Sequence, residues 1–80
     1  MNTNEGQFKV TVECRSAEAA QRAANKLKGF TKNVTNVIVK IVGNIVHMTF
    51  SAIRSHSLTI LGSIKDLLGM SYKPSIALAT

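Results

Sequence analysis

The side chains that could do chemistry are few, and they are spread along the chain. The chain has two histidines, His47 and His56, and a single cysteine, Cys14. It contains no Cys-x-x-Cys motif, and no cluster of carboxylates lies near these residues in sequence. Metal ligands normally occur at short spacings, so the sequence predicts no metal site. The acidic residues fall in separate expected elements: Glu5, Glu13, Glu18 and Asp66. No acid and base pair for catalysis is therefore expected.

Phosphate-binding motifs are missing from the sequence as well. Neither Gly-x-x-x-x-Gly-Lys-Ser/Thr nor Gly-x-Gly-x-x-Gly occurs, and these glycine-rich loops let backbone N–H groups surround a phosphate. Aromatic residues make up only 5% of the chain, so no stacking platform of the RNA-recognition type is expected. We expect a protein that is not an enzyme and uses no cofactor.

Basic residues are the clearest chemical feature of the chain. Ten Lys and Arg against four Asp and Glu give a net charge of +6, which favours an anionic partner. Five cations fall near one end of the first expected helix: Arg15, Arg22, Lys26, Lys28 and Lys32. This cluster could bind tRNA through its backbone phosphates without reading sequence. An ordinary solvated face is the alternative, and it is the more frequent reason for clustered charge.

Alternating and helical patterns place these residues on expected elements. Apolar and polar residues alternate over 7–15, which indicates a half-buried strand. A helix is predicted over 17–28, with Ser16 as its N-cap and Gly29 as its end. Two β-branched runs separated by Gly43 and Asn44 predict a hairpin that ends at Phe50.

A second helix is predicted from Ala52 to about Leu68, capped by Ser51 and ended by Gly69. Residues 75–80 could add a fourth strand or could be frayed. The order β-α-β-β-α predicts an α+β fold, with a three-stranded antiparallel sheet, the third strand in its middle, and both helices on one face. This is a truncated ferredoxin-like arrangement. Residues 1–6 are expected to be disordered, and residues 7–80 to form one domain.

Apolar stripes predict which faces are buried. In the hairpin, one face combines Val37, Val39 and Ile41 with Val46, Met48 and Phe50, and is expected to be core. A helical stripe is expected to join that core: Ile53, Ile60, Ile64, Leu67 and Leu68. The opposite face of the sheet is unusually apolar at Ile38, Val42 and Ile45, and these residues are expected to form a dimer interface.

The far side of the second helix is the expected docking surface for a larger partner. It combines apolar contacts with a charged rim: Arg54, Leu58, Leu61, Gly62 and Lys65. A glycine inside a helix lowers stability by about 1 kcal/mol relative to alanine, and a closely approaching helix of another subunit would explain it.

Length and composition set the class of protein. The 80 residues are 45% hydrophobic and 18% charged, which is typical of one small globular domain. A lone cysteine cannot form a disulfide within the chain, so Cys14 is expected to be a buried, inert thiol in a reducing compartment. No secretory leader and no apolar run of about 20 residues is found. A cytoplasmic protein with no membrane contact is expected.

The chain resembles the CTAG family, the small dimer-forming subunit of the KEOPS complex. FKVTVE at 8–13 leads to SAEAA at 16–20, and MTFSA at 48–52 leads to LTILGSIKDLL at 58–68. The family's mid-helix Arg is missing, and Arg54 is the nearest candidate to replace it. Gly62-Ser63 or Ser63-Ile64 stands where the family often has Asn-Ser. The chain is similar to a divergent, archaeal-type member or paralog.

The resemblance implies an accessory role without catalysis. KEOPS makes threonylcarbamoyladenosine in tRNA, and the family's small subunit dimerises, docks on the catalytic subunit and helps to hold tRNA. The implied partners are the catalytic subunit of a KEOPS-like complex, tRNA, and a second copy or a paralogous small subunit. Two alternatives remain: a stand-alone basic RNA- or DNA-binding module, and a small structural oligomer.

Overall fold

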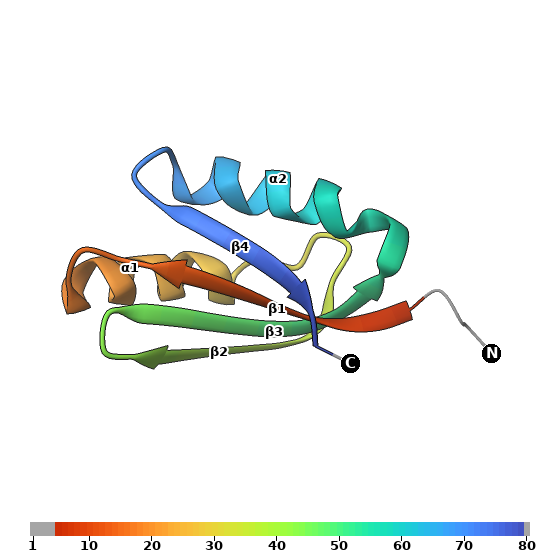
Figure 1. The fold of residues 1–80 in the computed structure, drawn as a ribbon, viewed down its shortest axis with the longest axis horizontal. Helices are drawn as coiled ribbons and strands as arrows, with labels where there is room; N and C mark the ends of the chain where they lie inside the picture. The colour runs from red at the N-terminus through yellow and green to blue at the C-terminus, as the bar shows by residue number, and fades with distance from the viewer. Residues whose placement is uncertain (1–4, 80) are drawn as a thin grey trace.

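The computed structural model describes residues 5–79, which form four strands, two α-helices and one short 3-10 turn (Figure 1). In chain order these are β1 (Glu5–Glu13), α1 (Ala17–Lys28), β2 (Thr35–Val42), β3 (Ile45–Ile53), the 3-10 turn (Arg54–His56), α2 (Ser57–Leu68) and β4 (Lys73–Leu78).

The sheet is antiparallel, with strand order β2-β3-β1-β4. The predicted α+β class is confirmed, and β3 lies between β1 and β2 as expected. The predicted number of three strands is wrong, because β4 pairs with β1 from Glu13↔Lys73 to Phe8↔Leu78. Proline can enter an edge strand, so Pro74 does not prevent this pairing. The fold is therefore a complete β-α-β-β-α-β, ferredoxin-like arrangement.

The hairpin forms where the sequence predicts it. Val42 pairs with Ile45 around a two-residue turn, and Gly43 has φ of 63°, a left-handed conformation that glycine adopts without steric penalty. The register shifts between Thr35 and Ile38. The inner face of β3 is buried as predicted. On β2, Val37 and Val39 are only partly buried. Ile41 is 37% exposed, because β2 is the edge strand of the sheet.

Helix α1 has the predicted bounds, and its signals are all local. The Ser16 Oγ accepts a hydrogen bond from the Ala19 N–H at 3.2 Å, which satisfies a free donor of the first turn. The inward side is completely buried and, apart from Leu27, consists of alanine: Ala19, Ala20, Ala23, Ala24 and Leu27. Small side chains allow the helix to lie close to the sheet.

The predicted start of the second helix is wrong. Ser51 is not an N-cap; it is buried inside β3, between Gln7 of β1 and Thr35 of β2. Its carbonyl accepts a hydrogen bond from the Thr35 Oγ1 at 3.5 Å. Pairing with β1 extends β3 to Ile53, so the α-helix begins only at Ser57, after the 3-10 turn.

This shift changes the helical core stripe. Ile60, Ile64 and Leu68 are buried as predicted. Ile53 and Leu67 are each 37% exposed, so the prediction that they belong to the core is wrong. Ile53 ends a strand, and a side chain on a strand does not share the helical period.

The predicted disorder of residues 1–6 is wrong for its last two residues. Glu5 and Gly6 begin β1 and pair with Ile53 and Ala52; residues 1–4 lie outside the described residues. A Cβ at Gly6 would lie 2.9 Å from the Nε of Arg54. The Arg54 side chain therefore packs against the backbone of β1.

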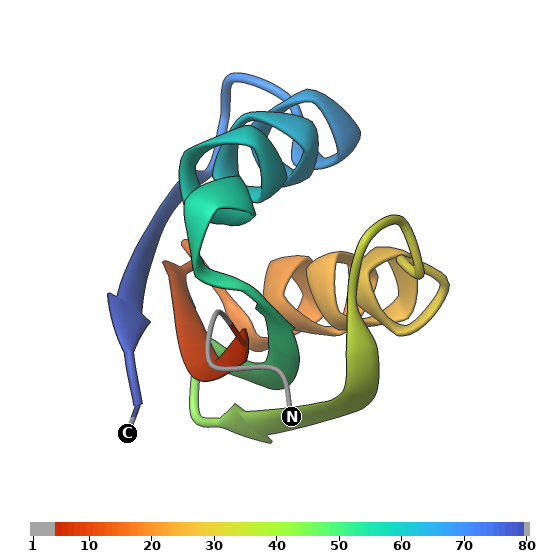
Figure 2. The same cartoon turned by 90° about the vertical axis from the view of Figure 1, so that its right-hand side faces the viewer.

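Both helices cover one face of the sheet, and the core lies between the two layers (Figure 2). Phe8 and Phe50 stack in this core with ring centroids 5.8 Å apart. Cys14 is buried as predicted, and burial raises the pKa of its thiol. Within residues 5–79, no helix lies over the other face of the sheet.

Candidate functional site

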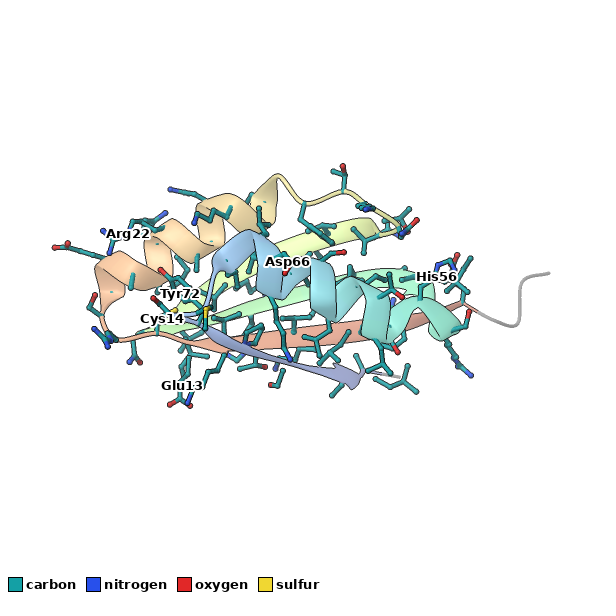
Figure 3. All side chains as sticks on the ribbon, turned by 90° about the horizontal axis from the view of Figure 1, so that it is seen from above. Glu13, Cys14, Arg22, His56, Asp66 and Tyr72 are labelled. Atoms are coloured by element: carbon teal, nitrogen blue, oxygen red, sulfur yellow. The ribbon has the colours of Figure 1, made fainter. Side chains whose placement is uncertain are left out.

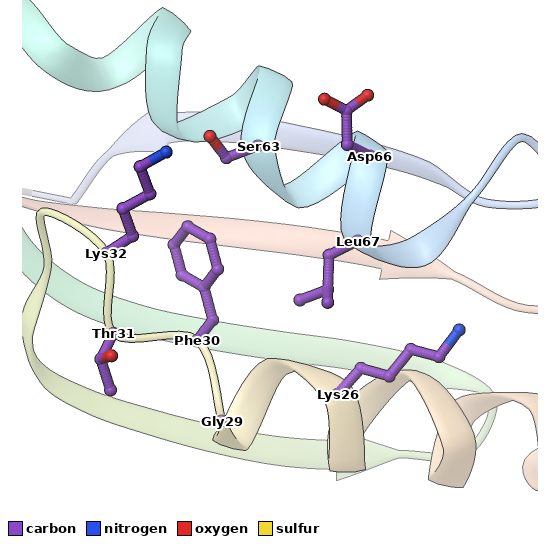
Figure 4. Close-up of a pocket in the computed structure, with 8 residues that line it drawn as sticks. All are labelled: Lys26, Gly29, Phe30, Thr31, Lys32, Ser63, Asp66 and Leu67. Carbon is purple, nitrogen blue, oxygen red and sulfur yellow. The ribbon is translucent and has the colours of Figure 1, made fainter.

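The five predicted tRNA-binding cations do not form one cluster. Arg15 precedes α1 and Lys28 is its last residue, so they lie about 20 Å apart along the axis at 1.5 Å per residue. Arg22 projects from the helix at the end of the molecule remote from His56 (Figure 3). Lys26 of α1 and Lys32 of the loop after Gly29 line one groove, on opposite sides of Phe30 and Leu67 (Figure 4).

These two lysines line a groove of about 570 Å³ between α2 on one side and the end of α1 with its following loop on the other (Figure 4). Phe30, which is buried, and the half-exposed Leu67 form its apolar part. The Lys32 side chain extends toward α2, where Ser63 and Asp66 complete the lining. The groove thus has two cations, one carboxylate and an apolar floor.

The α2 side of this groove was not predicted from the sequence. Phe30 follows the helix-ending Gly29 directly. A large aromatic residue just after a helix indicates that the loop packs against another part of the protein. Nothing in the sequence pattern relates Ser63 or Asp66 to Lys32, because only the packing of α2 beside α1 brings them together.

The predicted docking surface on α2 is largely assembled. Leu58, Gly62 and Lys65 are exposed and Leu61 is half-buried, and their spacing of three and four residues puts them on one side of the helix. Leu58 is 77% exposed, and a Cβ at Gly62 would meet nothing within 4 Å. Arg54 is not part of this surface, because its side chain lies against Gly6 of β1. We call Leu58, Leu61, Gly62 and Lys65 the α2 surface.

The predicted dimer interface lies on the uncovered face of the sheet. Ile38 and Val42 are 55% and 63% exposed, and Ile45 is half-buried. Val42 and Ile45 pair directly across β2 and β3, and Ile38 lies two rows away, opposite Thr49. Lys40 and His47 occupy the row between them. The structure therefore brings the three apolar residues onto one surface, with a lysine and a histidine inside it.

Residues 5–79 include no group of three His, Cys, Asp or Glu side chains that could hold a metal ion. Neither helix of the described chain has the length and apolar character that crossing a membrane requires. No family model, curated protein or solved structure matches the chain.

Proposed function

We propose that this chain is a non-catalytic accessory subunit of a KEOPS-like complex that makes threonylcarbamoyladenosine in tRNA. The observation that carries the proposal is the exposure of large apolar side chains on both layers: Leu58 on α2, and Ile38 and Val42 on the sheet. Grouped apolar residues on a surface mark interaction sites more often than isolated ones do. Two such surfaces suit a subunit that contacts two protein partners.

Each surface has its own role in this proposal. The outer sheet face pairs with a second copy or with a paralogous small subunit, through Ile38, Val42 and Ile45. The α2 surface docks the catalytic subunit, with Lys65 at its charged rim. The cations around the groove, Lys26 and Lys32, contact the tRNA backbone.

Reconstitution with the catalytic subunit of a KEOPS-like complex tests the docking role. Leu58→Asp places a charge in the centre of the α2 surface, and Gly62→Leu fills the space that a partner helix would occupy. Both variants should bind the catalytic subunit at least about tenfold more weakly, because one buries an unpaired charge in the interface and the other overfills it, and about 1.4 kcal/mol is enough for a tenfold loss. Calorimetric titration measures the affinity.

The matched control is Asn25→Asp, an exposed position on α1 with the same change in charge as Leu58→Asp. It should leave the affinity unchanged. Circular dichroism should show that all variants remain folded. Equal affinity for the wild type and both α2 variants, or no binding by the wild type, would reject this function.

A stand-alone RNA- or DNA-binding module is the second candidate, and the presence of both Lys26 and Lys32 in the lining of one groove favours it. If about three phosphates are neutralised, the logarithm of the tRNA affinity should fall with the logarithm of salt at a slope near −2 to −3. Lys26→Glu with Lys32→Glu should abolish most of this slope. Much stronger tRNA binding in the reconstituted complex than by the chain alone would favour the accessory subunit.

A further inference from the structure

A hollow of about 310 Å³ lies on the outer face of the sheet, away from both helices. Ile38, Lys40 and Val42 of β2 form one wall, His47 and Thr49 of β3 form the floor, and Lys9 of β1 forms the other wall. This volume is at the lower end of the range for small-molecule sites, which is about 300–1,000 Å³.

The strand register explains why these side chains meet. Lys40 lies directly opposite His47, while Ile38 and Lys9 lie on either side of Thr49. Because alternate residues of a strand point to the same face, Lys9 and Lys40 stand on opposite sides of the floor. Three strands therefore contribute one basic side chain each to a single concave site.

The charge in the hollow is of one sign. None of its six lining residues is acidic. Glu13, on the same face of β1, lies directly opposite Lys73 of β4, where opposite charges on neighbouring strands attract. Glu5 is at the far end of β1, paired with Ile53. The two ammonium groups of the hollow thus face no carboxylate of its own lining.

The imidazole in the floor is also incompletely bonded. The Nδ1 atom of His47 is buried and has no hydrogen-bond partner within residues 5–79. A buried polar atom without a partner is uncommon in folded proteins and calls for an explanation. This nitrogen has almost no accessible surface, so a ligand in the hollow would reach it only if the imidazole ring moved.

We propose that this hollow binds an amphipathic carboxylate, a molecule with one anionic head and a short apolar body. Lys9 and Lys40 attract the head from both sides, since ammonium groups and carboxylates form charge-assisted hydrogen bonds. Ile38 and Val42, which are more than half exposed in the chain alone, cover the apolar body. A free inorganic anion would leave these two side chains in water, so the hollow discriminates against it.

Titration with sodium octanoate, followed by the amide NMR signals of the protein, tests this site. Octanoate should shift the signals of Ile38, His47 and Thr49 in a saturable way. Two further titrations test the apolar body and the anionic head of the ligand separately. The ligand 1-octanol has the apolar body without the charge, and inorganic phosphate has the charge without the apolar body. Each should bind about tenfold more weakly than octanoate or not at all, because each retains only half of the contacts.

The variant Lys9→Gln with Lys40→Gln should weaken octanoate binding by about fivefold to tenfold, as expected for the loss of two exposed ion pairs. The matched control is Arg22→Gln with Lys28→Gln, which removes the same charge from the exposed side of α1, outside the hollow, and should leave binding unchanged. Octanoate shifts centred on Leu58 or Phe30, equal binding of octanol and octanoate, or equal binding by the two double variants would each overturn the proposal.

The site shares Ile38 and Val42 with the proposed pairing surface, so octanoate and a paired subunit would exclude each other there. Running the titration at two protein concentrations reveals this competition, because pairing lowers the apparent affinity as the protein concentration rises. An affinity that does not depend on protein concentration would reject pairing through this face while leaving the carboxylate site intact.

Discussion

At the scale of single residues, two exposed glycines have opposite structural requirements. Gly62 lies inside α2, and a Cβ there would meet nothing within 4 Å. Gly43 also has open space around it, but its φ of 63° is a left-handed conformation. Space alone therefore does not decide whether alanine is tolerated.

Replacing each glycine by alanine should change stability in opposite directions. Gly62→Ala should raise the free energy of unfolding by about 0.5–1 kcal/mol, because alanine loses less backbone entropy in a helix. Gly43→Ala should lower it by about 1 kcal/mol, since the side chain disfavours the left-handed conformation. Urea unfolding of both variants measures the difference. A stabilising Gly43→Ala, or a destabilising Gly62→Ala, would contradict the described backbone.

The thiol of Cys14 should respond to pH in one direction. Burial raises the pKa of this thiol, so the folded state disfavours the thiolate. Its contribution to stability is complete below the pKa of the unfolded thiol and is lost as the pH rises through the folded value. The difference in unfolding free energy between the wild type and Cys14→Ala should therefore shrink as the pH rises above about 8.5, the ordinary pKa of a cysteine thiol.

A thiol reagent provides a direct check on the same residue. The thiolate is the reactive form, and Cys14 is only 8% exposed. Labelling of the native protein at pH 8 should be much slower than labelling in urea. Equal labelling rates would show that the thiol is accessible in the folded state.

At the scale of elements, β4 is the strand for which the sequence pattern allows two predictions, a fourth strand or a frayed end. In the structure it pairs with β1 along six residues. Pro74 is buried opposite Val12. The backbone N–H of Ala79, just beyond the strand, donates to the Gln7 carbonyl at 2.7 Å. Before β4 begins, the Tyr72 hydroxyl donates to the Ala19 carbonyl at 3.3 Å.

Deleting residues 73–80 should therefore destabilise the whole domain, although the segment is short. It removes six cross-strand residue pairs from β1, at about 0.5–1.5 kcal/mol for each lost hydrogen bond. Small domains have only about 5–15 kcal/mol in total, so we expect a largely unfolded or aggregating chain. Deleting Thr80 alone is the control. A truncated chain with unchanged thermal unfolding would show that β4 is dispensable.

Some of the elements can be predicted from the sequence alone, and others cannot. Helix α1 and the hairpin were predicted correctly because their signals are local: the Ser16 cap, the alanine face, and the Gly43-Asn44 turn. The start of α2 was predicted wrongly because Ser51 fits two roles, and pairing with β1 decides between them. A local pattern contains no information about that distant strand.

For the candidate surfaces too, local patterns can be predicted from the sequence, and contacts between distant segments cannot. The four residues of the α2 surface lie on one helix, so helical spacing was sufficient to place them together, whereas Arg54, the fifth residue predicted for the docking surface, precedes the helix. The groove beside Phe30 and the hollow around His47 combine residues from separate elements. Only the packing of the helices and the register of the strands place these residues together.

At the scale of the whole molecule, the uncovered sheet face should control self-association. We expect the chain to form dimers or larger species at micromolar concentration, because Ile38 and Val42 remain largely exposed. Ile38→Lys with Val42→Lys should shift light scattering toward the 8.6 kDa monomer. Leu58→Lys, on the other layer, should leave the dimer unchanged. A monomeric wild type that pairs with no small subunit would contradict the pairing role.

The position of β1 also determines the order in which this chain can fold during synthesis. β1 lies between β3 and β4 in the sheet, and Phe8 pairs with Phe50 on one side and with Leu78 on the other. Phe50 follows Phe8 by 42 residues and Leu78 follows it by 70, so both partners are synthesised after β1. Only the β2–β3 hairpin joins neighbouring residues, and non-local strand pairing is slow because loop closure costs entropy before contacts form. The second edge of β1 therefore stays unpaired until β4 is made, and unpaired strand edges make incompletely folded chains prone to aggregate.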